Sequence, residues 1–288
     1  MTKTRPKAKI GIIGGSGTYN VQGAKEVDTI KIWTPFGNPS DSIKIFEIEG
    51  KNVAFLPRHG RGHRLNPTEI PVRANIWALK SLGVEKIITI SAVGSLREEI
   101  KPRDFIIPDQ IIDRTKSRVN TFFENGLVAH VAFAEPFCSD LNNTVFESIN
   151  SANMVKIHRD KTYICMEGPL FSTKAESNLY RSWNADIIGM TALPEAKLAR
   201  EAEICYCCIA MCTDYDCWHS EHDAVTLEMV IGHMKANNAN SQDLLKRIIK
   251  DIPEKRKCRC GEALKEAIIT DKSTIPEEVK DNLGIIIN

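Results

Sequence analysis

The sequence lacks the features that mark membrane, secreted and nucleic-acid-binding proteins. No apolar run approaches the ~18–20 residues that a membrane-spanning helix needs. Basic and acidic residues nearly cancel (38 Lys and Arg against 37 Asp and Glu), so no excess charge favours nucleic acid or a membrane surface. Residues 1–7 are basic but no long apolar segment follows them, and we expect no signal peptide. We therefore expect a cytoplasmic protein that binds neither nucleic acid nor a membrane.

Two common phosphate-binding motifs are also missing. Residues 9–18 run from short apolar residues into glycines, which predicts a strand entering a tight loop. No Lys follows the last glycine, so this is not a P-loop, and the spacing of a dinucleotide-binding fingerprint fails. Glycines nevertheless let backbone N–H groups approach an anion, and Ser16 adds a hydroxyl donor. A plain turn explains the loop equally well.

Cysteine is present in an odd number, nine, which does not favour a framework of disulfides. Five of the nine lie between Cys205 and Cys217, in or just after an apolar run, as is typical of reduced, buried thiols. Cys258 and Cys260 differ because they lie in a polar region near the C-terminus. Such an i,i+2 pair is compatible with a labile disulfide, with part of a metal site or with two free thiols.

Alternating apolar segments predict the fold class α/β, with a single domain of 288 residues built on a mixed, twisted sheet flanked by helices. Residues 1–8 form an expected N-terminal tail, and residues from about 253 to 288 an expected polar, irregular extension. We expect strands at residues 9–13, 53–57, 84–91, 105–108, 111–112, 161–166, 186–190 and 204–212. We expect helices at residues 68–82, 139–152, 173–183, from 194, after 219 and at 241–252.

The apolar run at residues 204–212 predicts a buried strand that ends beside two carboxylates, Asp214 and Asp216. In extended chain they point to the same side, and ligands of open α/β sheets bind at the carboxyl ends of the strands. Adenine offers an acceptor at N7 beside a donor at N6, which suits one protonated and one ionised carboxyl group. We expect the proximity of two carboxylates to raise the pKa of one. The alternative is a pair of solvated loop residues.

Basic and hydroxyl side chains follow other predicted strands. Residues 58–64, after the strand at 53–57, combine arginines, histidines and glycines. Arg58 suits bidentate contact with phosphate, and His59 can donate a further hydrogen bond. Ser91 and the small residue Ala92 end the strand at 84–91. Three such strand ends predict one anion subsite; the alternative is a solvated basic loop, and the arginines argue against a metal site.

Together these motifs resemble 5′-methylthioadenosine phosphorylases, members of the purine nucleoside phosphorylase family of the trimeric type. The resemblance covers roughly residues 9–250. It is carried by residues 11–17, 58–60, 74–80, 94–99, 167–169, 190–196 and 213–218.

The resemblance implies the nucleoside phosphorylase fold and a set of site residues. The implied phosphate ligands are Ser16, Arg58, His59, Ser91, Ala92 and Thr191. The implied substrate contacts are Phe171, Met190, Asp214 and Asp216, with Asp214 catalytic. Ser172, Leu227 and Val230 are implied to set specificity, together with His130 of a neighbouring subunit. A homotrimer or a dimer of trimers is implied, with no metal and no organic cofactor.

The implied reaction converts 5′-methylthioadenosine and inorganic phosphate, the co-substrate, to adenine and 5-methylthioribose 1-phosphate, a step of methionine and purine salvage. A broader purine nucleoside phosphorylase that also takes adenosine or inosine is the alternative; a nucleoside hydrolase and a non-catalytic nucleotide-binding protein come next. Two departures from the family pattern stand out. Gly189 replaces an Asn that many such enzymes carry, and the Cys258/Cys260 pair resembles some archaeal members that form hexamers.

Overall fold

Two long strands, β5 and β11, form the central pair of the fold, and all their residues except Ala92 are buried. The computed structural model describes residues 6–15, 24–219, 232–233 and 243–287, and in this part of the chain eleven strands form one mixed sheet. The strands are β1 (Ile10–Gly14), β2 (Lys25–Ile30), β3 (Ile43–Ile48), β4 (Lys51–Pro57), β5 (Lys86–Ser95), β6 (Phe105–Ile107), β7 (Gln110–Arg114), β8 (Ile157–Arg159), β9 (Thr162–Met166), β10 (Ile187–Gly189) and β11 (Cys205–Asp214).

The order along the sheet is β2-β3-β4-β1-β5-β10-β9-β7, while β11 pairs with both β5 and β6, and β6 pairs with β8. Strands β4, β1, β5 and β11 are parallel to their neighbours in this group. Their carboxyl ends therefore lie at one edge of the sheet, where an α/β fold places its ligands.

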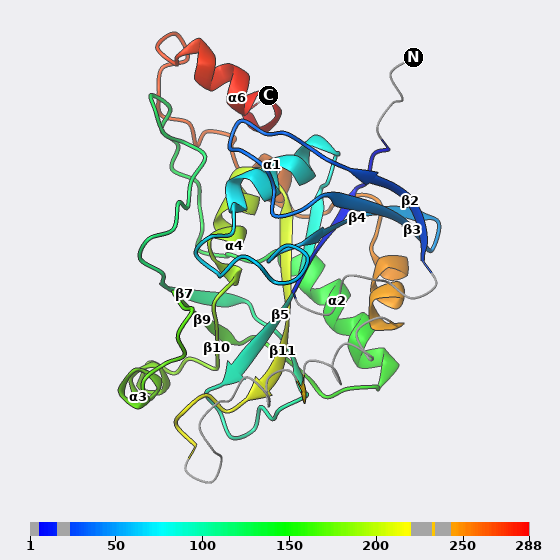
Figure 1. The fold of residues 1–288 in the computed structure, drawn as a ribbon, viewed down its shortest axis with the longest axis vertical. Helices are drawn as coiled ribbons and strands as arrows, with labels where there is room; N and C mark the ends of the chain where they lie inside the picture. Colours follow the sequence, from blue (N-terminus) through cyan, green and yellow to red (C-terminus); the bar gives the residue numbers. More distant parts are fainter. Residues whose placement is uncertain (1–5, 16–23, 220–231, 234–242, 288) are drawn as a thin grey trace.

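Both faces of the sheet are covered, as Figure 1 shows. The helices are α1 (Val72–Ser81), α2 (Ser139–Ala152), α3 (Lys174–Ser182), α4 (Ala192–Glu201), the short 3-10 helix η1 (Arg259–Glu262) and α6 (Glu277–Ile287); residues 243–251 are also helical. Side chains of α1, α4 and α6 share one core cluster, and those of α2 and the segment 243–251 share another.

Strand β11 is apolar from Cys205 to Cys212, before Thr213 and Asp214 at its end. Tyr206, Cys208 and Ala210 belong to the first core cluster, and Cys207 and Ile209 to the second. Successive side chains of a strand point to opposite faces, so a strand buried on both faces has no place for a polar residue. The prediction of a buried strand here is confirmed.

Several predicted helices are confirmed, and one begins later than expected. Helix α2 spans the predicted residues, and α3 begins with the predicted capping box between Thr173 and Glu176. The helix predicted from residue 68 begins only at Val72, because the side chain of Asn66 accepts hydrogen bonds from the backbone of Thr68 and Glu69 and holds a turn there. The helix predicted after residue 219 lies outside the described residues.

The expectation of an irregular C-terminal segment was wrong. Helix α6 packs against α1, with Leu283 and Ile286 each only 2% exposed, and the indole of Trp77 donates a hydrogen bond of 3.0 Å to the Asn282 carbonyl. Strands β2, β3 and β8 were also missed. None of the described helices combines the length and the apolar character that crossing a membrane requires.

Candidate active site

Asp214 is the last residue of β11 and is only 7% exposed. A register shift between Cys212 and Asp214 places it opposite Gly94 of β5, where an added β-carbon would lie 2.8 Å from the Asp214 Oδ1. Gly94 therefore leaves the room that the carboxyl group occupies, since any larger residue would displace it.

Thr213 and the backbone of Asp216 hold the Asp214 carboxyl group. The Thr213 hydroxyl donates to Oδ2 over 2.7 Å, and the Asp216 N–H donates to Oδ1 over 2.8 Å. The same hydroxyl also lies 3.2 Å from the Val93 carbonyl. When Asp214 is protonated, Thr213 can turn its single hydrogen to Val93, so it supports both charge states of the carboxyl group.

Asp216 reaches the site through a turn and not through the strand. The strand has already ended, and Asp216 adopts a positive φ of 51°. The expected same-side geometry of an extended Asp-x-Asp segment was therefore wrong, although the turn brings both carboxyl groups into one buried region, with Asp216 6% exposed. The alternative of solvated loop residues is excluded.

Burial is the main reason why these carboxyl groups hold protons more tightly. It raises the pKa of Asp214 to about 6, against the opposing hydrogen bonds from Thr213 and the Asp216 N–H, while the Asp216 charge adds a smaller increase. Burial also raises the pKa of Asp216. The predicted repulsion between the two carboxylates is therefore present at Asp214, but desolvation is the larger cause.

Ser91 lies beside Thr191 in the middle of β5, because the strand that was predicted to end at Ser91 continues to Ser95. Their hydroxyl oxygens are 3.0 Å apart. Strand β10 is antiparallel to β5, so Met190 and Thr191, which follow it, run back alongside Ala92 and Ser91. Four residues that the resemblance implied are thus brought together on two neighbouring strands.

Arg58 lies at the same edge but is engaged by protein groups. Its side chain is 1% exposed; Nε and Nη2 donate to the Glu195 carboxylate over 2.5 and 3.1 Å, and Nη1 donates to the Ile90 carbonyl over 2.9 Å. Nη1 is also the side-chain atom nearest Gly15, 3.8 Å from where a β-carbon would lie. The bidentate contact that was expected with phosphate is made with the Glu195 carboxylate in this structure.

His59 is fixed in one tautomer. Its Nδ1 lies 2.9 Å from the Leu65 carbonyl, which can only accept, so Nδ1 carries the proton. Burial and the Arg58 charge lower the pKa of His59 to about 4, and the ring stacks on His63 with centroids 4.1 Å apart. A neutral ring with its proton on Nδ1 has an acceptor at Nε2, where the sequence led us to expect a donor.

The other site residues that the resemblance implied differ in how exposed their side chains are. Phe171 is 49% exposed, and Ser172 is half-buried, with its carbonyl 3.2 Å from the Cys217 sulfur, next to Asp216. His130 is exposed, and its backbone N–H donates a hydrogen bond to the Ala267 carbonyl. Ser16, Leu227 and Val230 lie outside the described residues.

Sequence reasoning missed Arg118, which holds the segment after β10. Its Nη1 donates to the carbonyls of Met190 and Leu193 over 2.5 and 2.6 Å, and the side chain is 3% exposed. No pattern in the sequence around Arg118 distinguishes it from a surface arginine. Its partners are backbone carbonyls 48 to 75 residues away in the sequence.

Close packing explains why residue 189 is glycine. A β-carbon there would lie 2.0 Å from the Tyr163 hydroxyl oxygen and 3.1 Å from Val93. We expect Gly189→Ala to destabilise the fold by about 1–3 kcal/mol, the usual cost of overpacking. The double variant Gly189→Ala/Tyr163→Phe, which removes the nearest atom, should recover part of this loss in urea denaturation. Equal stability of Gly189→Ala and the wild type would contradict the packing argument.

Comparisons with known proteins identify the family of the chain. Residues 9–250 match the Phosphorylase superfamily, and the chain belongs to it. It is 53% identical to the S-methyl-5′-thioadenosine phosphorylase of Koribacter versatilis over 281 residues, which cover 98% of this chain and 96% of the relative. The recognition of the resemblance is thereby confirmed.

Solved structures of methylthioadenosine phosphorylases are also similar to this chain. A methylthioadenosine phosphorylase from an antarctic soil metagenomic library is 47% identical, with a TM-score of 0.94, covering 99% of this chain and all of the other. The enzyme of Schistosoma mansoni in complex with adenine is 33% identical, with a TM-score of 0.85, covering 94% of this chain and all of the other. The predicted fold class is confirmed.

Proposed function

We propose that this protein catalyses the phosphorolysis of 5′-methylthioadenosine, giving adenine and 5-methylthioribose 1-phosphate. The main observation behind this proposal is that Ser91 and Gly94, two residues of strand β5, lie next to different groups of site residues. Ser91, paired with Thr191, lies three residues before Gly94, which faces Asp214. Three residues of strand span about 10 Å, which leaves room for a ribose between a phosphate and a purine.

The base subsite suits adenine. Protonated Asp214 donates to N7, and the Asp216 carboxylate accepts from the N6 amino group. Transfer of the proton to N7 gives the departing base the charge it needs as the bond to C1′ loosens. The raised pKa of Asp214, about 6, keeps part of the enzyme in the protonated form near neutral pH.

The phosphate subsite combines hydroxyl, backbone and cationic groups. Ser91, Ala92 and Thr191 approach the anion from β5 and the segment after β10, with Ser16 from the loop after β1. Arg58 contributes its charge and the remaining N–H of Nη1, while Nε2 of neutral His59 accepts a hydrogen bond from a protonated phosphate oxygen. Phosphate then attacks C1′ from the face opposite the base. Held in this way, the two reactants gain mainly from positioning and charge complementarity.

Phe171 and Met190 contact the nucleoside in this proposal, and Ser172 lies next to the base. The 5′-methylthio group enters an apolar pocket formed by Leu227, Val230 and His130 of a neighbouring subunit. The proposal therefore includes a homotrimer or a dimer of trimers. It also includes a cytoplasmic location and no cofactor beyond inorganic phosphate as co-substrate.

The first test is adenine release from 5′-methylthioadenosine with and without phosphate. We expect omission of phosphate to lower the rate at least about a hundredfold, because the anion is the nucleophile. Inosine should be used at least about 10²-fold less efficiently, since its O6 would face the Asp216 carboxylate without a proton between them. Release at an equal rate without phosphate would identify a hydrolase, and good use of inosine would identify a broader phosphorylase.

A further inference from the structure

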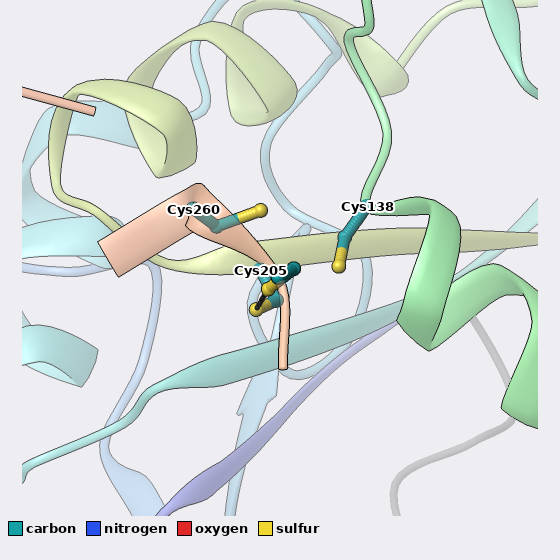
Figure 2. Close-up of side chains that lie close together, drawn as sticks. Cys138, Cys205 and Cys260 are labelled. Carbon is teal, nitrogen blue, oxygen red and sulfur yellow. Dashed lines mark hydrogen bonds between the residues drawn. The ribbon is translucent and has the colours of Figure 1, made fainter. Parts of the chain in front are cut away.

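Four cysteines outside the proposed active site converge from three separate parts of the chain. Cys138 precedes α2, Cys205 begins β11, and Cys258 and Cys260 belong to the segment around η1. Their four sulfur atoms all lie within 4.8 Å of one another. Figure 2 shows Cys138, Cys205 and Cys260 turned toward a common centre from these different elements.

We propose that these four thiolates bind one structural zinc ion. Zinc in a closed site of four cysteine ligands has Zn–S bonds of about 2.3 Å in a tetrahedron, so its sulfur atoms are about 3.8 Å apart. The Cys205 and Cys258 sulfur atoms are 3.3 Å apart, and the others lie within the 4.8 Å limit, so a small shift centres all four on one ion. Two disulfides would instead divide the four into two pairs bonded at about 2.05 Å.

The surroundings suit the charge of such a site. Four thiolates and one Zn²⁺ carry a net charge of −2, which has to be balanced where water is scarce. Cys138 and Cys205 are each 2% exposed and Cys260 is 6% exposed. The charged residues that line the pocket of about 230 Å³ beside them are four basic ones, Lys86, Lys255, Arg256 and Lys257, and one acidic one, Asp140. An anionic metal cluster would therefore lie beside an excess of basic side chains.

The position of the cluster argues for a structural role. Cys205 and Asp214 are the first and last residues of β11, about 30 Å apart along the strand. The zinc would fasten the C-terminal segment to the start of this core strand and to the residue before α2. Because four protein ligands leave no open coordination position, the ion has no place for substrate. The proposed zinc site does not depend on the proposed phosphorylase reaction.

The test measures zinc bound to the full chain. The protein is expressed with added zinc, purified with a reductant and without chelator, and analysed by mass spectrometry for metals. We expect about one zinc per chain, falling below about a tenth in the double variant Cys258→Ser/Cys260→Ser. Cys217→Ser, at the other end of β11, is the matched control and should keep its zinc. Cobalt(II) exchanged into the wild type should give the absorption of tetrahedral thiolate coordination.

Two results on the wild type would overturn the proposal, whatever the variants do. One is a chain that takes up no zinc and shows all nine thiols on denaturation. The other is a chain that takes up no zinc and shows five thiols, because two disulfides have formed. If zinc is bound, its removal by a chelator should lower the melting temperature by several degrees, and the double variant should not respond to the chelator.

Discussion

The Asp214→Asn variant is expected to lose about 10²–10⁴-fold in kcat for 5′-methylthioadenosine while it keeps its fold. Asn has the same shape, and its oxygen can still accept the hydrogen bond from the Asp216 N–H. Its amide nitrogen then takes the place of Oδ2 and donates to the Thr213 hydroxyl, which turns its own hydrogen to the Val93 carbonyl. Asn carries no proton that can be given to N7, and general acid catalysis contributes a factor of this size. Adenine release measured at saturating substrate separates this loss from weaker binding.

The pH profile gives a second measurement of the same group. Because burial raises the pKa of Asp214 to about 6, the free enzyme loses the required proton as pH rises through this value. We expect kcat/KM to fall above about pH 6, with about a tenth of the protonated form left at pH 7. In Asp214→Asn this descending limb should be absent.

Asp216→Asn is the matched control for both measurements. Its amide oxygen can still accept from the N6 amino group, so the loss should be smaller and the descending limb should remain. Turnover by Asp214→Asn within about threefold of the wild type would show that N7 receives its proton by another route. A descending limb that survives in Asp214→Asn but vanishes in Asp216→Asn would exchange the roles of the two aspartates.

Local chemistry explains what the sequence predicted well. The apolar run of β11 has to be buried on both faces, and the Thr173–Glu176 capping box fixes the start of α3 through two hydrogen bonds within four residues. The parallel register of β4, β1 and β5 then brings Ser91, in the middle of β5, toward Arg58, which follows β4. Each of these steps depends on residues close in sequence or on a general rule of α/β sheets.

Long-range and conformational effects explain what was missed. Glu195 lies 137 residues from Arg58, and no local sequence pattern around either residue indicates that the two form a buried ion pair. The turn at Asp216, with its positive φ, is set by the ending of β11 and is not visible in an Asp-x-Asp segment. Helix α6 is charged on its exposed side, and only its contact with α1 identifies its apolar residues as core.

The buried pair of Arg58 and Glu195 also predicts a large effect on stability. Both side chains are 1% exposed, and Glu195 accepts from Arg58 at both oxygens and from the Tyr206 hydroxyl over 3.1 Å. Burial by itself would lower the pKa of Arg58, but the Glu195 charge outweighs it and raises this pKa, so Arg58 stays charged. Removing one partner leaves a buried charge without its counterion.

We expect Glu195→Gln to lower the free energy of unfolding by about 3–5 kcal/mol, measured by urea denaturation at one fixed protein concentration. Lys280→Gln, which breaks the more exposed pair with Glu277, is the control and should change the free energy of unfolding by less than about 1 kcal/mol.

In the double variant Arg58→Met/Glu195→Leu both charges are gone, so much of the stability should return while phosphorolysis stays impaired. Recovery of stability without recovery of turnover would separate the two roles of Arg58, because only the phosphate subsite needs its charge. An unchanged unfolding midpoint in Glu195→Gln would mean that water or phosphate, and not Glu195, compensates the guanidinium.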